Sequence, residues 1–421
     1  MIHIQLDSDE TRTSLRRFLL IWKWVAFSIL VGILTGLIGS AFSIALYNIT
    51  QFRLAHSWMI FFLPLCGIGV VLTYRLFGIQ RDEGTNLVIS AIQSTKEVPG
   101  SMAPIIFITT LLTHLGGGSA GREGAALQMG GSIGSTVGKL FRFDSKNKKI
   151  LIMCGMAGVF SALFGTPMSA TIFSMELISV GVMYYAALLP SAISSLIAYQ
   201  IAKYLGVKHE LFILSNIPNF TWKTALIIIL LTFLAALVGI LFCSSLKLSS
   251  HLFRTYIPTP YLRVLLSAGI IILLTQIIGN QDYNGTGIHI IQRAMEGKVV
   301  LPAFFLKILF TAITIGAGFK GGEIVPSLFI GSTFGCAFGT VIGFDPVLSA
   351  AVGLIAVFCG VTNCPITSLL IGFEMFGFAA VPYFLISVAF SYVFSGYSGL
   401  YKSQKILYSK YRQVYVDRHS Q

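Results

Sequence analysis

Two stretches of glycines, each carrying one glutamate, interrupt an otherwise apolar sequence. The first is Gly116–Gly124, which contains Gly121, Arg122 and Glu123, and the second is Gly316–Glu323, 200 residues later (321 − 121 = 200). Glycine lets an ion approach the backbone closely. A helix that begins within a membrane presents unpaired N–H groups and about half a positive charge. The two stretches therefore predict an ion site, suited to anions, built from broken helices.

Glu123 is the side chain in these loops that is best suited to chemistry. A carboxylate near the membrane centre costs about 2.5–3.5 kcal/mol on insertion scales, so it usually has a role. Its negative charge can occupy an anion site and compete with a transported anion, and protonation would release it. The structural alternative is an ion pair between Arg122 and Glu123. We favour the functional interpretation because adjacent residues on a helix do not face each other.

Three more glutamates lie at corresponding places in the two halves. Glu323 matches Glu123 and is interpreted either as a second proton carrier or as a residue bonded to loop amides or to Lys320. For Glu323 we favour the structural role over that of a proton carrier. Glu176 and Glu374 each follow a proline break by nine residues, and we predict that they bond to neighbouring helix ends.

The repeat extends beyond the glycine loops. At a constant offset of 198 (353 − 155 = 198), a glycine, a phenylalanine, a proline and a glutamate recur: Gly155, Phe160, Pro167 and Glu176 match Gly353, Phe358, Pro365 and Glu374. Two related halves with unwound segments at matching positions are typical of a transporter fold, with the ligand where the broken ends meet.

The composition indicates a protein that lies mostly in lipid. The chain has 421 residues, of which 55% are hydrophobic and 11% charged, against about 25% charged in ordinary soluble domains. Apolar runs long enough to span recur at 18–46, 58–77, 182–205, 223–245, 261–279 and 379–396. We predict an all-α polytopic membrane protein with roughly ten or more embedded segments. Its expected parts are an N-terminal segment (1–20), two repeat halves (21–205 and 206–400), and a C-terminal helix or tail (401–421), too short for a soluble regulatory domain.

Charge and cysteine usage bound the partners. The net charge of +13 comes from basic clusters beside the first span, after the last one, and in the loop 139–149. The positive-inside rule places both termini in the cytoplasm. Contact with anionic lipid accounts for the charge, so nucleic acid is not expected. The six cysteines and seven histidines show no metal-ligand spacing, and no metal or cofactor is expected.

Hydroxyl groups occur at two further places. Thr85 and Asn86 follow Gly84 at the start of another apolar segment, where they could donate to an anion or act as an ordinary helix cap. Tyr401 follows a long apolar run and by itself is typical of an interfacial tyrosine.

These motifs resemble the CLC chloride channels and proton-coupled anion antiporters. Gly121–Gly124 resembles the family's GREGP loop, with Ala125 in place of proline, and Gly322–Pro326 resembles its GIFAP loop. Gly84–Val88 is similar to the GSGIP loop, and Leu400-Tyr401 resembles the segment with the central anion-binding tyrosine. The resemblance runs from about residue 20 to residue 410.

The resemblance implies a homodimer with one pore per subunit and two inverted repeats of tilted and broken helices. It also implies that Glu123 is the outer gating glutamate and that Thr85 and Tyr401 supply hydroxyls to a central anion. Further anion-contacting positions would be Asn86, Gly121, Arg122, Gly124, Ile324 and Val325.

Three departures from the family pattern bear on proton coupling and anion choice. Leu177 stands where chloride/proton antiporters carry an inner glutamate, Thr85-Asn86 replaces Ser-Gly, and Glu323 replaces an apolar residue. Together they resemble the family's fluoride/proton antiporter branch.

The leading hypothesis is halide transport gated by Glu123 and linked to protons, with chloride or fluoride as the anion. A fluoride/proton antiporter and a passive chloride channel are alternatives within the family. A polytopic membrane enzyme, with Glu123 and His114 as an acid/base pair, is the alternative from another class. The chain contains no Walker motif, so we do not expect an enzyme. A cation transporter would need more intramembrane acids.

Overall fold

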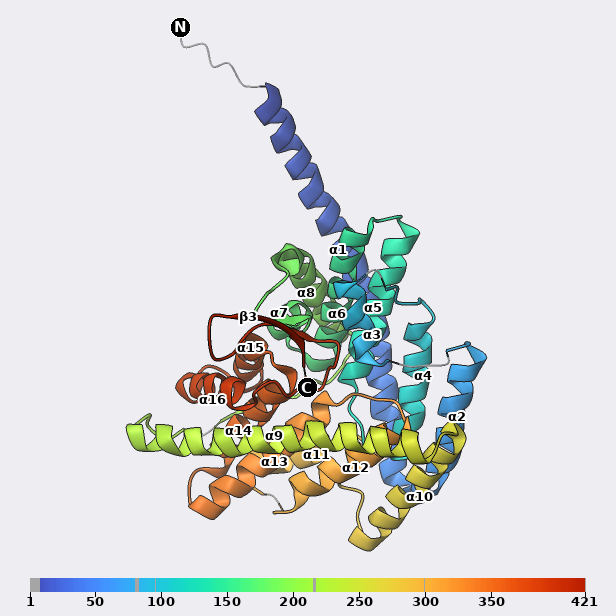
Figure 1. Cartoon of the computed structure of the whole chain (residues 1–421), viewed down its shortest axis with the longest axis vertical. Coiled ribbons are helices and arrows are strands. Elements are labelled where there is room, and N and C mark those ends of the chain that lie inside the picture. The colour runs from blue at the N-terminus through green and yellow to red at the C-terminus, as the bar shows by residue number, and fades with distance from the viewer. Residues whose placement is uncertain (1–7, 80–82, 95, 215–216, 299, 421) are drawn as a thin grey trace.

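The computed structural model describes residues 8–79, 83–94, 96–214, 217–298 and 300–420, with side chains from residue 17 onward. The described residues are mostly helical (Figure 1). The first half of the chain forms α1 (Ser8–Ala55), α2 (Leu63–Leu76), α3 (Thr85–Gln93), α4 (Met102–Leu115), α5 (Glu123–Leu140), α6 (Ser145–Phe164), α7 (Pro167–Glu176) and α8 (Leu188–Tyr204).

The second half repeats this order of long and short helices. It forms α9 (Trp222–Tyr256), α10 (Pro260–Ile278), α11 (Ile288–Met295), α12 (Ala303–Ala317), α13 (Ile324–Ile342), α14 (Pro346–Thr362), α15 (Pro365–Phe376) and α16 (Val381–Phe394). Two short 3₁₀ helices, η1 (Ser57–Phe62) and η2 (Tyr185–Ala187), precede α2 and α8.

The lengths of the helices confirm a multi-pass membrane fold. Among the described residues, 7 helices are long and apolar enough to cross a membrane, and shorter apolar helices such as α12 and α15 lie between them. The predicted N-terminal segment 1–20 has no separate structure where it is described, because α1 already begins at Ser8. Residues 1–7 lie outside the described part.

Helices of each half pack with their backbones in contact. A methyl group added at Gly155 of α6 would lie 2.0 Å from the Gly130 carbonyl oxygen of α5. In the second half, a methyl at Gly353 of α14 would lie 2.4 Å from the Gly331 oxygen of α13. Small residues allow such close approach where no hydrophobic effect drives helices together. These pairs hold α5 and α13, which carry the glycine loops, at fixed positions.

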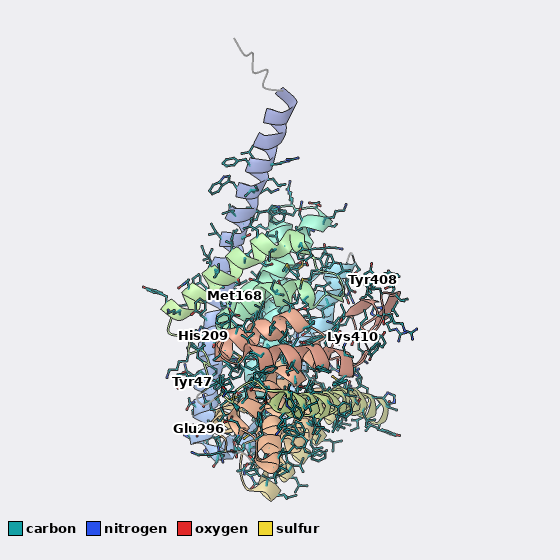
Figure 2. All side chains as sticks on the ribbon, turned by 90° about the vertical axis from the view of Figure 1, so that its left-hand side faces the viewer. Tyr47, Met168, His209, Glu296, Tyr408 and Lys410 are labelled. Carbon is teal, nitrogen blue, oxygen red and sulfur yellow. The ribbon has the colours of Figure 1, made fainter. Side chains whose placement is uncertain are left out.

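The C-terminal segment differs from the prediction of a helix or tail. Residues Lys405–Tyr408 (β2) and Tyr415–His419 (β3) form an antiparallel pair, and β2 also pairs in parallel with β1 (Ser179–Val180). Ile406 is fully buried between them. The helix expected within 401–421 is therefore wrong, because β2 pairs with the nearby β3 and also with β1, a partner more than 200 residues away that the local pattern does not reveal. Tyr408 and Lys410 mark this segment in Figure 2.

Candidate functional site

The two glycine loops meet directly, although they are 200 residues apart. Gly121 and Gly322 form an antiparallel backbone bridge, with Gly121 N–H donating to the Gly322 oxygen (2.6 Å) and Gly322 N–H donating to the Gly121 oxygen (2.8 Å). A methyl at Gly322 would lie 2.4 Å from the Gly124 nitrogen. Glycine is therefore required here because backbone packs against backbone. The starts of α5 and α13 converge at this bridge.

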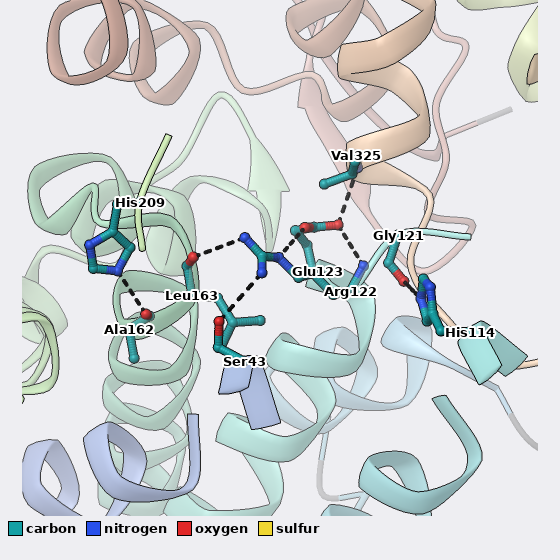
Figure 3. A network of polar contacts seen from close by, with 9 residues as sticks. All are labelled: Ser43, His114, Gly121, Arg122, Glu123, Ala162, Leu163, His209 and Val325. Atoms are coloured by element: carbon teal, nitrogen blue, oxygen red, sulfur yellow. Dashed lines mark hydrogen bonds and ion pairs between the residues drawn. The ribbon is translucent and has the colours of Figure 1, made fainter. Parts of the chain in front are cut away.

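Glu123 is fully buried at the point of convergence (Figure 3). Its Oε2 accepts hydrogen bonds from two backbone amides, Arg122 N–H (2.9 Å) of its own loop and Val325 N–H (3.1 Å) of the other repeat. A side chain at Gly121 would lie 2.5 Å from this oxygen. Amides at two helix starts thus hold a carboxyl oxygen, at a place where the helix dipole favours negative charge.

Arg122 contacts Glu123, contrary to our argument from helix geometry. Its Nε lies 3.7 Å from Glu123 Oε1, which has no hydrogen-bond partner among the described residues. The argument fails because Arg122 is the N-cap of α5, with φ −118° and ψ −11°, and is not yet part of the helix. Its guanidinium also reaches the Ser43 hydroxyl (3.4 Å) and the Leu163 carbonyl oxygen (3.3 Å).

Among the described residues, the His114 side chain makes no hydrogen bond to Glu123, so the two do not form an acid/base pair there. Its Nε2 lies 3.3 Å from the Gly121 carbonyl oxygen, so the imidazole supports the loop from behind. In the part of the chain that the structure describes, no group of three His, Cys, Asp or Glu side chains could hold a metal.

Thr85 and Tyr401 are buried near the same loops. The Thr85 hydroxyl lies 3.5 Å from the Gly124 carbonyl oxygen, and α3 begins at this residue after Gly84, whose φ is +59°. The Tyr401 hydroxyl is buried and has no hydrogen-bond partner among the described residues. A buried hydroxyl normally has a partner, so this one indicates a ligand position.

Asn86 joins α3 to the segment that carries Tyr401. Its side-chain oxygen accepts a hydrogen bond from Ser403 N–H at 2.9 Å. This contact fixes the Thr85 helix relative to the C-terminal strands. The partner of the Asn86 oxygen is thus Ser403, which lies two residues after Tyr401.

Glu323 stands at the start of α13, and Leu177 directly follows α7. Glu323 is the N-cap of α13, and its Oε2 lies 3.4 Å from the position of a methyl at Gly124. Tyr401 lies within electrostatic range of both Glu323 and Glu123. Leu177 is fully buried, and its carbonyl oxygen accepts from Gln404 Nε2 (3.1 Å).

Glu176 and Glu374 each accept hydrogen bonds from the start of a helix in the other repeat, as predicted for residues that bond to helix ends. The Glu176 carboxylate accepts from the backbone of Ile366 (3.0 Å) and Thr367 (2.8 Å) at the start of α15. The Glu374 carboxylate accepts from Met168 (2.8 Å) and Ser169 (2.8 Å) at the start of α7. The exchange is reciprocal, as expected for two related halves.

A loop that the sequence reasoning missed also supports the site. Asn284 Nδ2 donates to the Gly117 carbonyl oxygen (2.9 Å), and Gly285 N–H donates to the Gly118 oxygen (3.1 Å). The signal was present, because Gly84-Thr85 recurs as Gly285-Thr286 at an offset of 201 (285 − 84 = 201). The offset differs by one from that of the glycine loops.

A small cavity lies between residues of both repeats near the two glycine loops. Its volume is about 30 Å³, and it is bordered by Arg122 and Val325, the two residues whose amides hold Glu123. Its remaining lining is mostly apolar, with one acid, Glu210.

Comparison with known proteins agrees with this geometry. Residues 66–396 match the family described as "Voltage gated chloride channel". A "Chloride/fluoride channel protein" of Pseudomonas syringae pv. tomato is 33% identical over 398 residues, which cover 93% of this chain and 88% of that protein. The "H(+)/Cl(-) exchange transporter ClcA" of Vibrio cholerae is 27% identical over 388 residues, covering 83% and 81%. The crystal structure of a CLC-type fluoride/proton antiporter has a TM-score of 0.88 and 31% identity, covering 91% of this chain and 98% of the other.

Proposed function

The chain belongs to the voltage-gated chloride channel (CLC) family, and on this basis we propose that it carries halide anions across a membrane in a manner linked to protons. The observation that carries the proposal is the pair of amides, Arg122 N–H and Val325 N–H, which hold the Glu123 carboxylate between the two repeats. A carboxylate oxygen and a halide need the same donors. Glu123 therefore occupies a halide position.

The proposed gate is the exchange of one negative charge for another. When Glu123 takes up a proton, its oxygen loses the charge that the two amides stabilise, and a halide can replace it there. When the proton leaves, the carboxylate returns and displaces the halide. Each cycle then couples the movement of the anion to the binding of a proton.

The central halide is proposed to lie between Thr85 and Tyr401. Both hydroxyls are buried, and that of Tyr401 has no partner among the described residues. Hydrogen bonds to an ion are stronger than neutral ones, so two hydroxyls hold a partly dehydrated halide without any fixed positive charge. Such a site also lets the ion leave.

We propose Glu323 as the second proton carrier rather than in the structural role that the sequence favours, because Leu177 leaves no glutamate at the inner position. Its carboxylate approaches Gly124, and it acts electrostatically on Tyr401. We further propose fluoride as the preferred anion. Two relatives above 30% identity, a chloride/fluoride channel protein and a fluoride/proton antiporter, include fluoride in their descriptions, and Glu323 and Asn86 depart from the chloride pattern.

Flux from liposomes tests this function. Purified protein is reconstituted with fluoride or chloride inside, and anion efflux and proton movement are recorded with and without an imposed proton gradient. We expect efflux of fluoride to exceed that of chloride and a proton gradient to drive the anion uphill. Flux of sodium or potassium in place of halide, or no halide flux, would contradict the proposal.

We also propose a homodimer that forms through the α7 and α15 face. Met168 and Ile366 are 48% and 49% exposed there, and the partly exposed Glu374 lies between the same helices. A carboxylate that faces lipid is costly. A second subunit would cover this face and keep the carboxylate away from the hydrocarbon.

The proposed orientation has both termini and the basic loop between α5 and α6 in the cytoplasm. Lys139, Lys148 and Glu97 border a pocket of about 180 Å³ on this loop, and positive loops remain on the cytoplasmic side of membranes. We propose that the repeats divide within residues 205–221, between α8 and α9.

A further inference from the structure

The loop between α10 and α11 is the second copy of the loop that carries Thr85. Gly84-Thr85 and Gly285-Thr286 each precede a short helix, α3 and α11. Each copy also contacts the first glycine loop: the Thr85 hydroxyl approaches the Gly124 oxygen (3.5 Å), and Gly285 N–H donates to the Gly118 oxygen (3.1 Å). The first copy is proposed above to face an anion.

Two cations are buried against the second copy. Lys307 of α12 is fully buried, and its Nζ donates to the carbonyl oxygens of Gly285 (2.7 Å) and Tyr283 (3.2 Å). Arg53 at the end of α1 is 2% exposed, and its Nη1 donates to Gln281 Oε1 (2.8 Å). These partners are neutral.

No carboxylate balances these two cations among the described residues. The ion pairs of that part of the chain include neither Arg53 nor Lys307. The one acid in the loop, Asp282, is paired with His289 (3.3 Å) and Arg293 (3.6 Å). The hydrogen bond from His289 lowers the pKa of the Asp282 carboxyl below its ordinary value. Buried charges are normally paired, so the buried Arg53 guanidinium, whose hydrogen-bond partner Gln281 is neutral, indicates a missing negative partner.

Buried nitrogens of Arg53 and His114 lie near Gly285. A methyl at Gly285 would lie 3.0 Å from Arg53 Nη2 and 3.7 Å from His114 Nδ1. Arg53 Nε and His114 Nδ1 are buried and have no hydrogen-bond partner in the described part of the chain. The glycine, with φ +60°, leaves this point unoccupied by any side chain of its own.

We propose that Arg53, Lys307 and the Asn284–Gly287 loop bind a small monovalent anion, a halide, at a second site distinct from that of Glu123. The guanidinium supplies charge and hydrogen bonds, and Lys307 fixes the loop through the Gly285 and Tyr283 carbonyl oxygens. The anion balances the Arg53 charge, which is otherwise buried without an anion.

A proton accompanies the anion at this second site. His114 Nε2 faces the Gly121 carbonyl oxygen and therefore carries the ring proton, so Nδ1 can donate to the anion only when a second proton is present. The charged groups that act on this ring are Arg53 of α1, Lys307 of α12 and Arg122 before α5, all cations. The second proton is held only while the anion is bound.

The second site lies toward the end of the protein away from the N-terminus. Arg53 is in the last turn of α1, which runs from the N-terminal end of the molecule toward the opposite end (Figure 1). His114 contacts Gly121, two residues before Glu123, and Gly285 contacts Gly118. A halide there would wait beside the Glu123 gate, on the side opposite the proposed cytoplasmic termini.

Calorimetric titration of the purified full-length protein with sodium fluoride and sodium chloride tests this site. In the wild-type protein we expect two halides per subunit with separable affinities. Arg53→Met and Lys307→Met should each lose one of them, or weaken it at least 10-fold, the effect of removing a hydrogen bond to an ion. Tyr401→Phe should weaken the other. Arg263→Met, a partly buried arginine of α10, is the matched control and should bind as the wild type does.

Arg53→Lys covers the case in which the methionine variants do not fold. It keeps the buried charge but lacks the fork that reaches Gly285, so it should fold and still weaken the second halide. Two wild-type affinities in folded Arg53→Lys and Lys307→Met would overturn the proposal and leave the function of Glu123 untouched. Absence of both halide binding and halide flux in the wild type would instead overturn the proposed function.

Discussion

The carboxylate of Glu123 makes both of its backbone hydrogen bonds through one oxygen, Oε2. Its other oxygen has only the Arg122 guanidinium nearby, at 3.7 Å. Glutamine in this place keeps the size and loses the charge and the exchangeable proton. We predict that Glu123→Gln retains halide flux in liposomes but that this flux no longer responds to an imposed proton gradient.

The control for this change is Glu296→Gln, at an exposed glutamate far from the paired loops. It removes one negative charge from the surface and should leave the proton dependence of flux unaltered. If Glu123→Gln transported halide with the wild-type response to protons, the gating role of Glu123 would have to be abandoned.

Tyr401 offers a second test with a single atom removed. Its hydroxyl is buried without a partner among the described residues, so deleting it breaks no hydrogen bond of the described protein. We predict that Tyr401→Phe keeps its thermal stability in halide-free buffer but binds halide about 10-fold or more weakly, as expected for loss of a hydrogen bond to an ion. Melting curves recorded with and without sodium fluoride measure both quantities. A loss of stability without halide would indicate a structural role for the hydroxyl instead.

At the scale of helices, glycines at the α5–α6 and α13–α14 contacts set how closely the loop-bearing helices can pack. A methyl at Gly155 or Gly353 would lie 2.0 or 2.4 Å from a carbonyl oxygen of the facing helix, which side-chain movement cannot relieve. We predict that Gly155→Ala and Gly353→Ala each destabilise the protein by about 1–3 kcal/mol. Thermal unfolding in detergent is the measurement. Gly269→Ala on α10, where no atom lies within 4 Å of the added methyl, is the matched control and should melt like the wild type.

The sequence was sufficient to predict the elements that the repeat marks twice. The matched loops at Gly121 and Gly321 predicted convergent broken helices, and the Gly121–Gly322 bridge confirms that the loops meet. Glu176 and Glu374, at matched positions after prolines, were predicted to bond to helix ends, and they do. A pattern that recurs after 200 residues carries information on long-range contact that a single occurrence does not.

What the sequence did not reveal depends on geometry at element ends and on distant partners. Arg122 reaches Glu123 because it precedes the first helical residue, and a boundary cannot be fixed to one position from sequence. The strand at Lys405–Tyr408 forms because β1 offers it a backbone partner from the first half. The Asn284–Gly287 loop was overlooked because its offset of 201 departs by one residue from that of the glycine loops.

At the scale of the whole molecule, neither half can form the site alone. Glu123 from the first half is held by Val325 of the second, and the capping carboxylates Glu176 and Glu374 are exchanged between halves. The halves are therefore linked by polar bonds at the centre of the molecule, where lipid cannot supply partners.

The helices that Glu176 and Glu374 link, α7 and α15, also form the face through which we propose that the dimer assembles. We predict that Met168→Cys and Ile366→Cys each crosslink to a species of twice the subunit mass when detergent-purified protein is treated with a bifunctional maleimide. The native cysteines are all buried, so they should not react. Leu273→Cys, 60% exposed on α10, serves as the control and should label with a monofunctional maleimide yet remain a single subunit. Met168, labelled in Figure 2, provides the first position to test.

Crosslinking at Leu273 with none at Met168 or Ile366 would move the subunit contact to another face, and a subunit-sized particle in light scattering would exclude the dimer.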